Sequence, residues 1–263
     1  MNDIKIFNDV LKTINNRTSV RAYLPKPLSQ QEIDTIIHCT MRAPTAGNMM
    51  FYSIIEVKDQ KKKDTLAITC DNQPFISKAP LILIFLADMQ RWYDYYGISN
   101  VQEKCKNINR LYRTPDESDL FLACCDALIA AQNAVIAAES LGIGSCYIGD
   151  IMENIETHRE MFNLPKWVFP ITLLCFGYPK QDQSKRILTS RFSDKFIHFI
   201  DSYKRFNKEE FSEMFRNYEK KSYVENAENL GQDYYFRKTG SAFAQEMNRS
   251  VKIAIQDWVK KDQ

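Results

Sequence analysis

The segment from Leu122 to Leu141 constrains the fold more than any other part of the chain. It reads as a helix that is apolar almost all round, so protein must cover it on every side, either in a large core or at a subunit interface. A bilayer would tolerate poorly the four polar residues that interrupt it, Asp126, Gln132, Asn133 and Glu139. We therefore expect a buried helix of a soluble protein rather than a membrane span.

The composition agrees with a packed, soluble protein. The 263 residues carry 35 Lys and Arg against 33 Asp and Glu, a formal net charge of +2, and 44% of them are hydrophobic. This excludes a disordered chain and a general polyanion-binding role, so we expect no nucleic-acid partner. The first ten residues contain Asp3, Lys5 and Asp9 and no long apolar run, which indicates no signal peptide and a cytoplasmic location.

The cysteines and histidines do not form a metal-binding pattern. Seven cysteines are an odd number without a Cys-x-x-Cys pair, and the three histidines lie far from any metal-ligand spacing. We expect reduced thiols, mostly in the core, and no metal. His38, His158 and His198 fall on predicted helical faces, where a structural role is the simpler interpretation.

Local patterns predict the elements of the core. Ser29 and Glu32 have capping-box spacing, so a helix begins there and ends before Pro44. The expected strands are 51–57, 81–87 and 171–176, the second buried on both faces. Further helices are expected up to about residue 15, from the Lys61–Lys63 triplet on an exposed face, and over 152–162.

Two regions stand apart from this core. Residues 91–118 are polar, aromatic and irregular, which favours a mobile lid or an insertion. After residue 205 the chain turns strongly polar, with amphipathic helices expected over 207–221 and 241–260. We therefore divide the chain into a core of residues 1–205 and a helical extension, 206–263, that packs on the core or on a second subunit.

Basic residues near both ends of the expected core have the chemistry of a phosphate site. Arg17, Ser19 and Arg21 place two guanidinium groups and a hydroxyl within five residues. Arg191, with Lys185 and Arg186 nearby, could close the same site from the other end of the chain. Ordinary exposed basic loops remain the alternative for both segments.

The glycines between Leu141 and Gly149 do not form a dinucleotide-binding loop. Such a loop must follow a strand and open a helix, whereas this one follows a long helix. Gly142 is better interpreted as a helix C-cap, and Gly149 could let a flat ligand approach the backbone. The sequence shows no nucleophile motif and no phosphate loop, so an organic cofactor could supply the chemistry.

In order along the chain, these segments resemble the FMN-dependent nitroreductase family, and most closely its oxygen-insensitive NADPH nitroreductase and flavin reductase subgroup. The resemblance covers about residues 14–205, and its most specific part runs from Gln132 to Gly149. The matching motifs are Arg17-Thr18-Ser19-Val20-Arg21, Ala43-Pro44-Thr45-Ala46-Gly47-Asn48, Ala79-Pro80 with Asp88, the run from Ala131 to Gly144, Tyr147-Ile148-Gly149, Gly177-Tyr178-Pro179, and Arg191 with Tyr203.

The resemblance implies an α+β fold in which helices flank a mixed, mostly antiparallel central sheet. It also implies an obligate homodimer with one FMN per subunit at the interface. In such a protein Arg17, Thr18, Ser19 and Arg21 would hold the FMN phosphate and the pyrimidine edge, and Arg191 would complete the phosphate site. Lys185 or Arg186 could supplement Arg191, because Thr189 stands where relatives often carry a lysine.

The remaining implied ligands surround the isoalloxazine ring. Thr45 and Asn48, on a loop from the other subunit, would sit beside it, and Gln73 matches a flavin-contacting position of the subgroup. Tyr147, Ile148 and Gly149 would present backbone near N5. Part of the family pattern in the Thr45–Asn48 loop is replaced here by Ala46, Gly47 and Met50. Arg237, Lys238 and Arg249 are what remains of the arginine-rich loop that grips the NADPH 2′-phosphate in relatives.

The implied activity is transfer of hydride from NAD(P)H, through FMN, to nitroaromatics, quinones or flavins by a ping-pong mechanism. No side chain needs to act as a nucleophile, because the protein orients the reactants and tunes the flavin. Two alternatives remain open. One is a dedicated single-substrate flavoenzyme on the same scaffold, deiodinase-like or flavin-consuming, with 91–118 as its lid. The other is a non-enzymatic binding module that contacts flavin, or nucleic acid through Lys61–Lys63.

Overall fold

The computed structural model describes residues 8–181, 188–216, 218 and 224–260, and its contacts divide the chain into two compact units. The first unit comprises Met1–Thr18 and Ser184–Ser241, and the second comprises Ser19–Gln183 and Ala242–Gln263.

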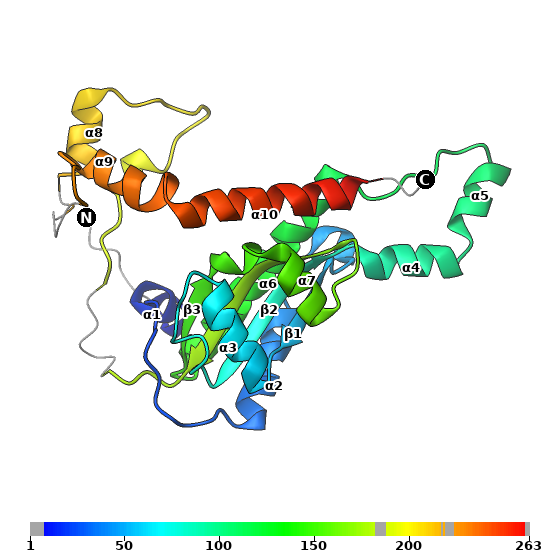
Figure 1. Cartoon of the computed structure of the whole chain (residues 1–263), viewed down its shortest axis with the longest axis horizontal. Coiled ribbons are helices and arrows are strands. Elements are labelled where there is room, and N and C mark those ends of the chain that lie inside the picture. Colours follow the sequence, from blue (N-terminus) through cyan, green and yellow to red (C-terminus); the bar gives the residue numbers. More distant parts are fainter. Residues whose placement is uncertain (1–7, 182–187, 217, 219–223, 261–263) are drawn as a thin grey trace. The chain divides into compact units, whose positions relative to one another are not determined.

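A four-stranded sheet forms the centre of the second unit (Figure 1). Its strands lie in the order β1-β2-β4-β3 and every neighbouring pair is antiparallel. The two central strands are almost wholly buried, as their continuous apolar runs predict. The strands are β1 (Tyr52–Glu56), β2 (Leu81–Asp88), β3 (Gly144–Ile148) and β4 (Val168–Gly177).

Helices cover both faces of this sheet, and the α+β expectation is confirmed. On one face α2 (Gln30–Met41) and α6 (Glu117–Ser140) pack on the inward side chains of β1, β2 and β4. On the other face lie α3 (Gln60–Thr69), the 3₁₀ turn η2 (Gly149–Met152) and α7 (Ile155–Phe162). The last helix, α10 (Ala242–Val259), packs on η2, α7 and α6.

Helix α6 reaches the sheet through a stripe of small residues. Ala123, Ala127, Ala130, Ala134 and Ala138 are almost completely buried and recur at helical spacing, which lets the helix lie close to the strands. Within the described part of the chain it is the one helix long and apolar enough to cross a membrane, and half of its most apolar window is buried in the protein.

The opposite side of α6 is exposed, in contrast to the full coverage expected from its sequence. Phe121 is 69% exposed, and Leu122, Leu128 and Ile129 are each 42% exposed. A single copy of the chain therefore covers only one side of the helix, which leaves the subunit-interface interpretation open.

Capping side chains set the helix boundaries as predicted. The Ser29 backbone N–H donates to Glu32 at 2.7 Å, and the Glu32 N–H donates to the Ser29 hydroxyl at 3.3 Å. Helix α2 then ends at Met41, before Pro44. The predicted strands and the helices over α2, α3, α6, α7 and α10 are confirmed, with boundaries shifted by a few residues.

Residues 91–118 are more regular than the sequence analysis predicts. They contain most of α4 (Gln90–Ile98) and all of α5 (Val101–Asn107). Aromatic side chains pack this segment on the rest of the unit, which its polar composition does not indicate. The ring centroids of Tyr93 and Trp167 are 5.0 Å apart, and Tyr93 also contacts Tyr96. The sequence analysis treated these aromatics as irregular, although their spacing of three to four residues places them on one side of a helix.

The lysine triplet is also less exposed than expected. Lys63 is 8% exposed, and its ammonium donates to the carbonyl of Ala79 at 3.0 Å. Lys62 donates to the carbonyl of Met161 at 2.8 Å. The long methylene stems of both residues cover apolar surface while their charges bind backbone oxygens, so neither ammonium is left as a free basic patch.

The first unit is built from short helices and aromatic packing. It contains α1 (Asp9–Asn16), η4 (Asp194–Phe196), α8 (Lys208–Met214), α9 (Leu230–Tyr234) and the π-helical turn η5 (Tyr235–Thr239). Phe206 contacts Phe196, Phe199 and Phe211. Helix α8 is shorter than the expected 207–221 helix, and the division at residue 205 stays a prediction.

Replacing Trp258 tests how much α10 contributes to the stability of the second unit. Its side chain is 1% exposed, and its indole N–H donates to the carbonyl of Asp116 at 3.2 Å. Trp258→Ala should lower the free energy of unfolding by about 3–5 kcal/mol, because it removes a large buried ring and leaves a cavity. Urea unfolding measures the change. Lys252→Ala, on the exposed side of the same helix, is the control, and equal stability of the two variants would contradict this packing.

Candidate functional site

The segment from Ser19 to Leu24 is attached along β3 and the end of β4. Ser19 forms a parallel bridge with Ser145, and the Val20 N–H donates to the carbonyl of Ser145 at 2.9 Å. Further along, the Leu24 N–H donates to the carbonyl of Tyr178 at 2.8 Å. These backbone hydrogen bonds place Ser19 and Arg21, two of the predicted phosphate ligands, beside an edge strand of the sheet.

Two glycines make this close attachment possible. A Cβ at Gly144 would lie 2.5 Å from Cγ2 of Val20, and one at Gly177 would lie 2.7 Å from Cδ1 of Tyr23. Neither glycine could be assigned to the site from the sequence, because the two close approaches depend on contacts between distant parts of the chain. The predicted C-cap is confirmed at Gly142, whose φ is +74°.

Strand β3 carries the backbone expected at the flavin ring. Tyr147 is half-buried and its hydroxyl donates to Oε1 of Gln132 at 3.2 Å, while Ile148 is buried in the opposite face. Gly149 begins η2, and a Cβ there would meet only Cε of Met152, at 4.0 Å. Its backbone is therefore open to a ligand. The strand spans about 13 Å from Ser145 to Gly149.

Gln73, the predicted ring contact, is hydrogen-bonded to Asp150, the residue after Gly149. The turn after α3 is closed by the Gln73 N–H, which donates to the carbonyl of Ala67 at 2.7 Å. The Gln73 side-chain amide donates to Oδ2 of Asp150 at 2.9 Å and to the carbonyl of Cys70 at 3.1 Å. The structure thus brings Gln73 and the end of β3 together through Asp150, which the sequence analysis did not consider.

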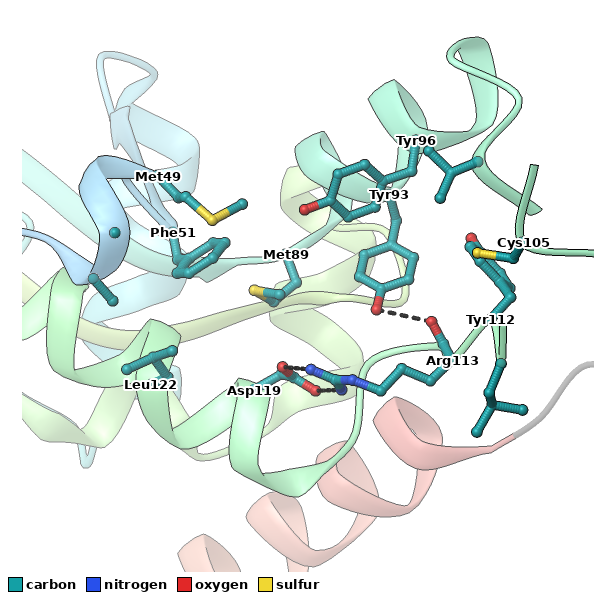
Figure 2. A pocket seen from close by; sticks show the side chains of 14 residues that line it. Met49, Phe51, Met89, Tyr93, Tyr96, Cys105, Tyr112, Arg113, Asp119 and Leu122 are labelled. Carbon is teal, nitrogen blue, oxygen red and sulfur yellow. Dashed lines mark hydrogen bonds and ion pairs between the residues drawn. The ribbon is translucent and has the colours of Figure 1, made fainter. Parts of the chain in front are cut away.

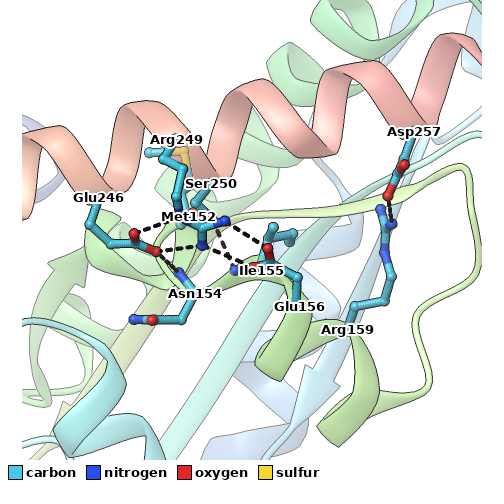
Figure 3. Close-up of polar contacts among 9 residues, drawn as sticks. All are labelled: Met152, Asn154, Ile155, Glu156, Arg159, Glu246, Arg249, Ser250 and Asp257. Atoms are coloured by element: carbon cyan, nitrogen blue, oxygen red, sulfur yellow. Dashed lines mark hydrogen bonds and ion pairs between the residues drawn. The ribbon is translucent and has the colours of Figure 1, made fainter.

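Helix α10 fixes the segment that follows Gly149 (Figure 3). The buried Ser250 hydroxyl accepts from the Ile155 N–H at 2.9 Å and donates to the carbonyl of Met152 at 2.6 Å. Arg249 donates to both oxygens of Glu156, at 2.7 and 3.0 Å. Ser250 matters more than this exposed ion pair, because buried groups are costly to leave without partners.

Glu153 is an acidic residue enclosed beside the same turn. It is 5% exposed, and its Oε1 atom has no hydrogen-bond partner in the described part of the chain. Burial, together with the nearby carboxyl groups of Asp150, Asp71 and Glu246, raises its pKa to about 7.

A second predicted ligand loop, around Thr45 and Asn48, is held by a buried carboxylate. Asp126 of α6 accepts from the Ala46 N–H at 3.0 Å and from the Phe51 N–H at 3.2 Å. Within the loop, the Thr45 hydroxyl accepts from the Met50 N–H at 3.2 Å. Asp126 interrupts an otherwise apolar helix, and that interruption is the signal from which its role could have been inferred.

Helix α4 holds the same loop from its other side and encloses a cavity with it. The Trp92 indole N–H donates to the carbonyl of Met49 at 2.7 Å. The cavity has a volume of about 480 Å³. Figure 2 shows Met49, Phe51 and Met89 on one side of it, facing tyrosines from α4 and from the segment after α5, with an ion pair at its base. The tyrosines are Tyr93, Tyr96 and Tyr112, and the ion pair is formed by Arg113 and Asp119.

The two predicted ligand regions of the second unit lie at opposite edges of the sheet. The Thr45–Asn48 loop leads into β1, whereas Gly149 follows β3. Two strands separate β1 from β3, so these edge strands are about 14 Å apart. The structure therefore brings Ser19, Arg21, Gln73 and Tyr147–Gly149 to one edge and does not bring Thr45 or Asn48 to them within one chain.

The other predicted residues belong to the first unit. Arg17 follows α1 and its Nη1 atom is enclosed without a hydrogen-bond partner among the described residues, and Thr18 comes next. Arg191 is exposed and donates to Thr189. Lys185 and Arg186 lie outside the described residues.

Two of the predicted NAD(P)H ligands, Arg237 and Arg249, already form ion pairs within the chain. Arg237 lies in η5, 3.4 Å from the carboxylate of Asp233 and 4.9 Å from the ring centroid of Tyr234, next to the exposed Lys238. Arg249, in the second unit, is bound to the carboxylates of Glu156 and Glu246. Its charge is therefore already compensated.

One histidine expectation is directly confirmed. His158 is fully buried, with its ring nitrogens 2.8 Å from the hydroxyl of Thr69 and 2.8 Å from the carbonyl of Ile151. Burial lowers its pKa, so it is neutral and structural. All seven cysteines are free thiols.

Comparison with known proteins settles the family. The model of the nitroreductase family matches residues 14–178. This chain belongs to the nitroreductase family. It is 34% identical over 180 residues to the FMN reductase (NADPH) of Bacillus subtilis, a match covering 68% of this chain and 69% of the relative.

Solved structures share the whole nitroreductase fold. NfrA2 of B. megaterium superposes with a TM-score of 0.73 and 26% identity, covering 98% of this chain and 100% of that one. The NADPH:FMN oxidoreductase from Vibrio harveyi, complexed with NAD+, has a TM-score of 0.76 at 21% identity, covering 94% and 98%. This second likeness concerns the fold alone.

Replacing Asp126 tests the loop anchor of this nitroreductase-family chain. Asp126→Ala leaves two buried N–H groups without acceptors, so the free energy of unfolding should fall by about 2–4 kcal/mol. Hydrogen exchange of the Ala46 and Phe51 amides should accelerate. Asp126→Asn retains one acceptor oxygen and should give a smaller effect, and unchanged exchange at both amides in Asp126→Ala would contradict the anchor.

Glu153 should make stability depend on pH. Its pKa is raised from 4.5 to about 7 in the folded chain, so between these values the folded state binds more protons than the unfolded state. Its contribution to stability therefore declines as the pH rises through this window. Glu153→Gln should gain stability relative to the natural chain as the pH rises, which urea unfolding at a series of pH values can measure. A constant difference across the window would contradict the buried-acid assignment.

Proposed function

We propose that this chain is an NAD(P)H-dependent flavin oxidoreductase that uses FMN. Membership of the nitroreductase family supports this, and so do two relatives in Bacillus subtilis, an FMN reductase (NADPH) and an FMN reductase [NAD(P)H]. The observation that carries the proposal is the attachment of Ser19–Leu24 along β3, which places a basic, hydroxyl-bearing segment beside the strand that ends at the open backbone of Gly149.

Polar atoms of this edge fit a phosphorylated flavin. Ser145, opposite Ser19, is fully buried, and its hydroxyl has no hydrogen-bond partner within the described ranges. Arg21 is exposed beside it and can donate to a phosphate. The strand from Ser145 to Gly149 then separates the phosphate end from the ring end by about 13 Å, which a ribityl chain spans only together with the phosphate group and the contacts at both ends.

Residues outside this edge complete the proposed site. Arg17, Thr18 and Arg191 are proposed as further phosphate ligands, and the orphaned Nη1 atom of Arg17 is consistent with an anion there. Gln73 and the backbone of Tyr147–Gly149 are proposed to contact the ring. Arg237 and Lys238 are the proposed ligands of the nicotinamide nucleotide.

The separation of the two ligand regions favours a homodimer. Thr45 and Asn48 lie at the edge opposite Gly149, so one ring can contact both regions only if two copies contribute. The exposed apolar side of α6, with Phe121, Leu122 and Leu128, supplies an uncovered surface for such an association. We therefore infer that the Thr45–Asn48 loop of each copy completes the site of the other.

When bound in this site, FMN would supply the hydride-transfer chemistry between NAD(P)H and an electron-poor acceptor. The chain's own residues would bind the phosphate and hold the ring beside the open backbone of Gly149. Donor and acceptor would use the same open face in turn, which predicts ping-pong kinetics with nitroaromatics, quinones or flavins as acceptors.

The second candidate function is the reduction of one dedicated acceptor. The cavity between α4, the segment after α5 and the Met49 loop favours it. Its tyrosines and apolar side chains suit a planar aromatic molecule, with the Arg113–Asp119 pair at its base. The ion pair keeps the pKa of Asp119 below its ordinary value, so the base of the cavity is ionised at neutral pH.

Steady-state kinetics test the function and distinguish the two candidates. NADH and NADPH should each be measured with nitroaromatic, quinone and free-flavin acceptors. Parallel double-reciprocal lines and several productive acceptors are expected. A single productive acceptor would favour the dedicated enzyme, and absence of flavin-dependent NAD(P)H oxidation would overturn the proposal.

The phosphate assignment predicts a loss of FMN affinity. Arg21→Ala combined with Arg191→Ala should weaken FMN binding by at least about 100-fold, because two charged donors to a phosphate are removed. Flavin fluorescence quenching measures the dissociation constant, and circular dichroism checks the fold. Arg216→Ala, at an exposed arginine two residues after α8, is the control, and an unchanged dissociation constant in the double variant would refute the assignment.

A further inference from the structure

Two carboxyl groups lie within four residues after Gly149, and the function proposed above uses neither. Asp150 is the second residue of η2 and Glu153 follows the end of that turn, with the Glu153 N–H donating to the carbonyl of Asp150 at 3.0 Å. Asp150 is half-exposed beside the open backbone of Gly149, and the Gln73 amide fixes it at 2.9 Å. Glu153 lies behind it, in the protein interior.

The surroundings of Glu153 disfavour a negative charge. The side chain is 5% exposed and its Oε1 atom has no partner in the described structure. The charged groups that act on it are all acidic: Asp150 on η2, Asp71 after α3, and Glu246 on α10.

Of these acidic groups, only Glu246 has a cationic partner among the described residues. Arg249 lies 2.7 Å from Glu246 and also binds Glu156, so its charge is already shared. The remaining titratable neighbours, Cys70 of the α3 turn and His158 of α7, are neutral, because burial raises the pKa of the thiol and lowers that of the imidazole. Burial beside these acidic groups therefore favours a proton on Glu153, and the adjacent carboxyl of Asp150 is placed to share it.

We propose that Asp150 and Glu153 share one proton, and that Asp150 delivers it to the acceptor while that acceptor is reduced beside Gly149. This inference rests on the proposed function. Asp150 is the group that meets the acceptor, and Glu153 is a positioning residue that keeps a proton on the pair at neutral pH.

The step balances for a quinone. Hydride arrival adds two electrons and one proton and leaves a hydroquinone anion. The O–H bond of the Asp150 carboxyl then breaks as the second O–H bond of the hydroquinone forms, and the remaining charge is shared with Glu153 through the carboxyl pair. When the product leaves, solvent returns one proton to the half-exposed Asp150. No other co-reactant is needed.

The shared proton can be tested on the protein without FMN. Infrared spectra across neutrality should show the C=O band of one protonated carboxyl, and Glu153→Gln should remove it. Asp150→Asn should keep the band but shift its titration to lower pH, because a like charge is lost. Glu160→Gln, an exposed glutamate of α7, should leave it unchanged. If Glu153→Gln fails to fold, absence of the band in the natural chain still overturns the shared proton.

Delivery of the proton is tested on the FMN-loaded protein. Asp150→Asn should slow acceptor reduction about 100-fold with equal flavin content, the usual contribution of a general acid. In the natural chain the step should slow as the pH rises past neutrality, and Glu153→Gln should abolish this dependence. An unaltered rate or pH profile in these variants would overturn delivery. Failure to bind FMN would instead overturn the proposed function, and the infrared result distinguishes the two cases.

Discussion

The backbone pairing of Ser19–Leu24 with β3 is the interaction on which the proposed site depends. It is held by hydrogen bonds from Val20 to Ser145 and from Leu24 to Tyr178, and it requires that Gly144 and Gly177 lack side chains. Because β3 is an edge strand, one of its sides is free to receive this segment. The pairing joins Ser19 and Arg21 to the strand whose far end leads to the open backbone of Gly149.

Buried polar side chains on two helices then fix the loops around this strand and around β1. Asp126 projects from the apolar helix α6 to hold the Ala46–Phe51 loop, and Ser250 projects from α10 to hold the turn after Gly149. In each case a single side chain satisfies two backbone groups, so its position is strongly determined. Helix α10 thus belongs structurally to the sheet-bearing unit, although it lies far from that unit in the sequence.

Local patterns predicted the parts of the fold that depend on local physics. The Ser29 capping box, the C-cap at Gly142 and the buried strand at Leu81–Asp88 follow from hydrogen bonding, backbone freedom and burial within a few residues. Long-range contacts were not predictable in this way. The aromatic packing of α4 depends on Trp167, and the burial of Lys63 depends on the carbonyl of Ala79. The family resemblance indicated Gln73, whereas Asp150 and Glu153 acquire significance only when the turn after α3 is brought beside η2.

The central claim is that a flavin bound along β3 carries the electrons, and anaerobic titration of the reconstituted protein tests it most directly. After removal of free FMN, the protein should retain about one flavin per chain, and one equivalent of NAD(P)H should bleach its visible absorbance. Adding a quinone should then restore the oxidised spectrum. Retained flavin that neither nicotinamide nucleotide can reduce would contradict the account.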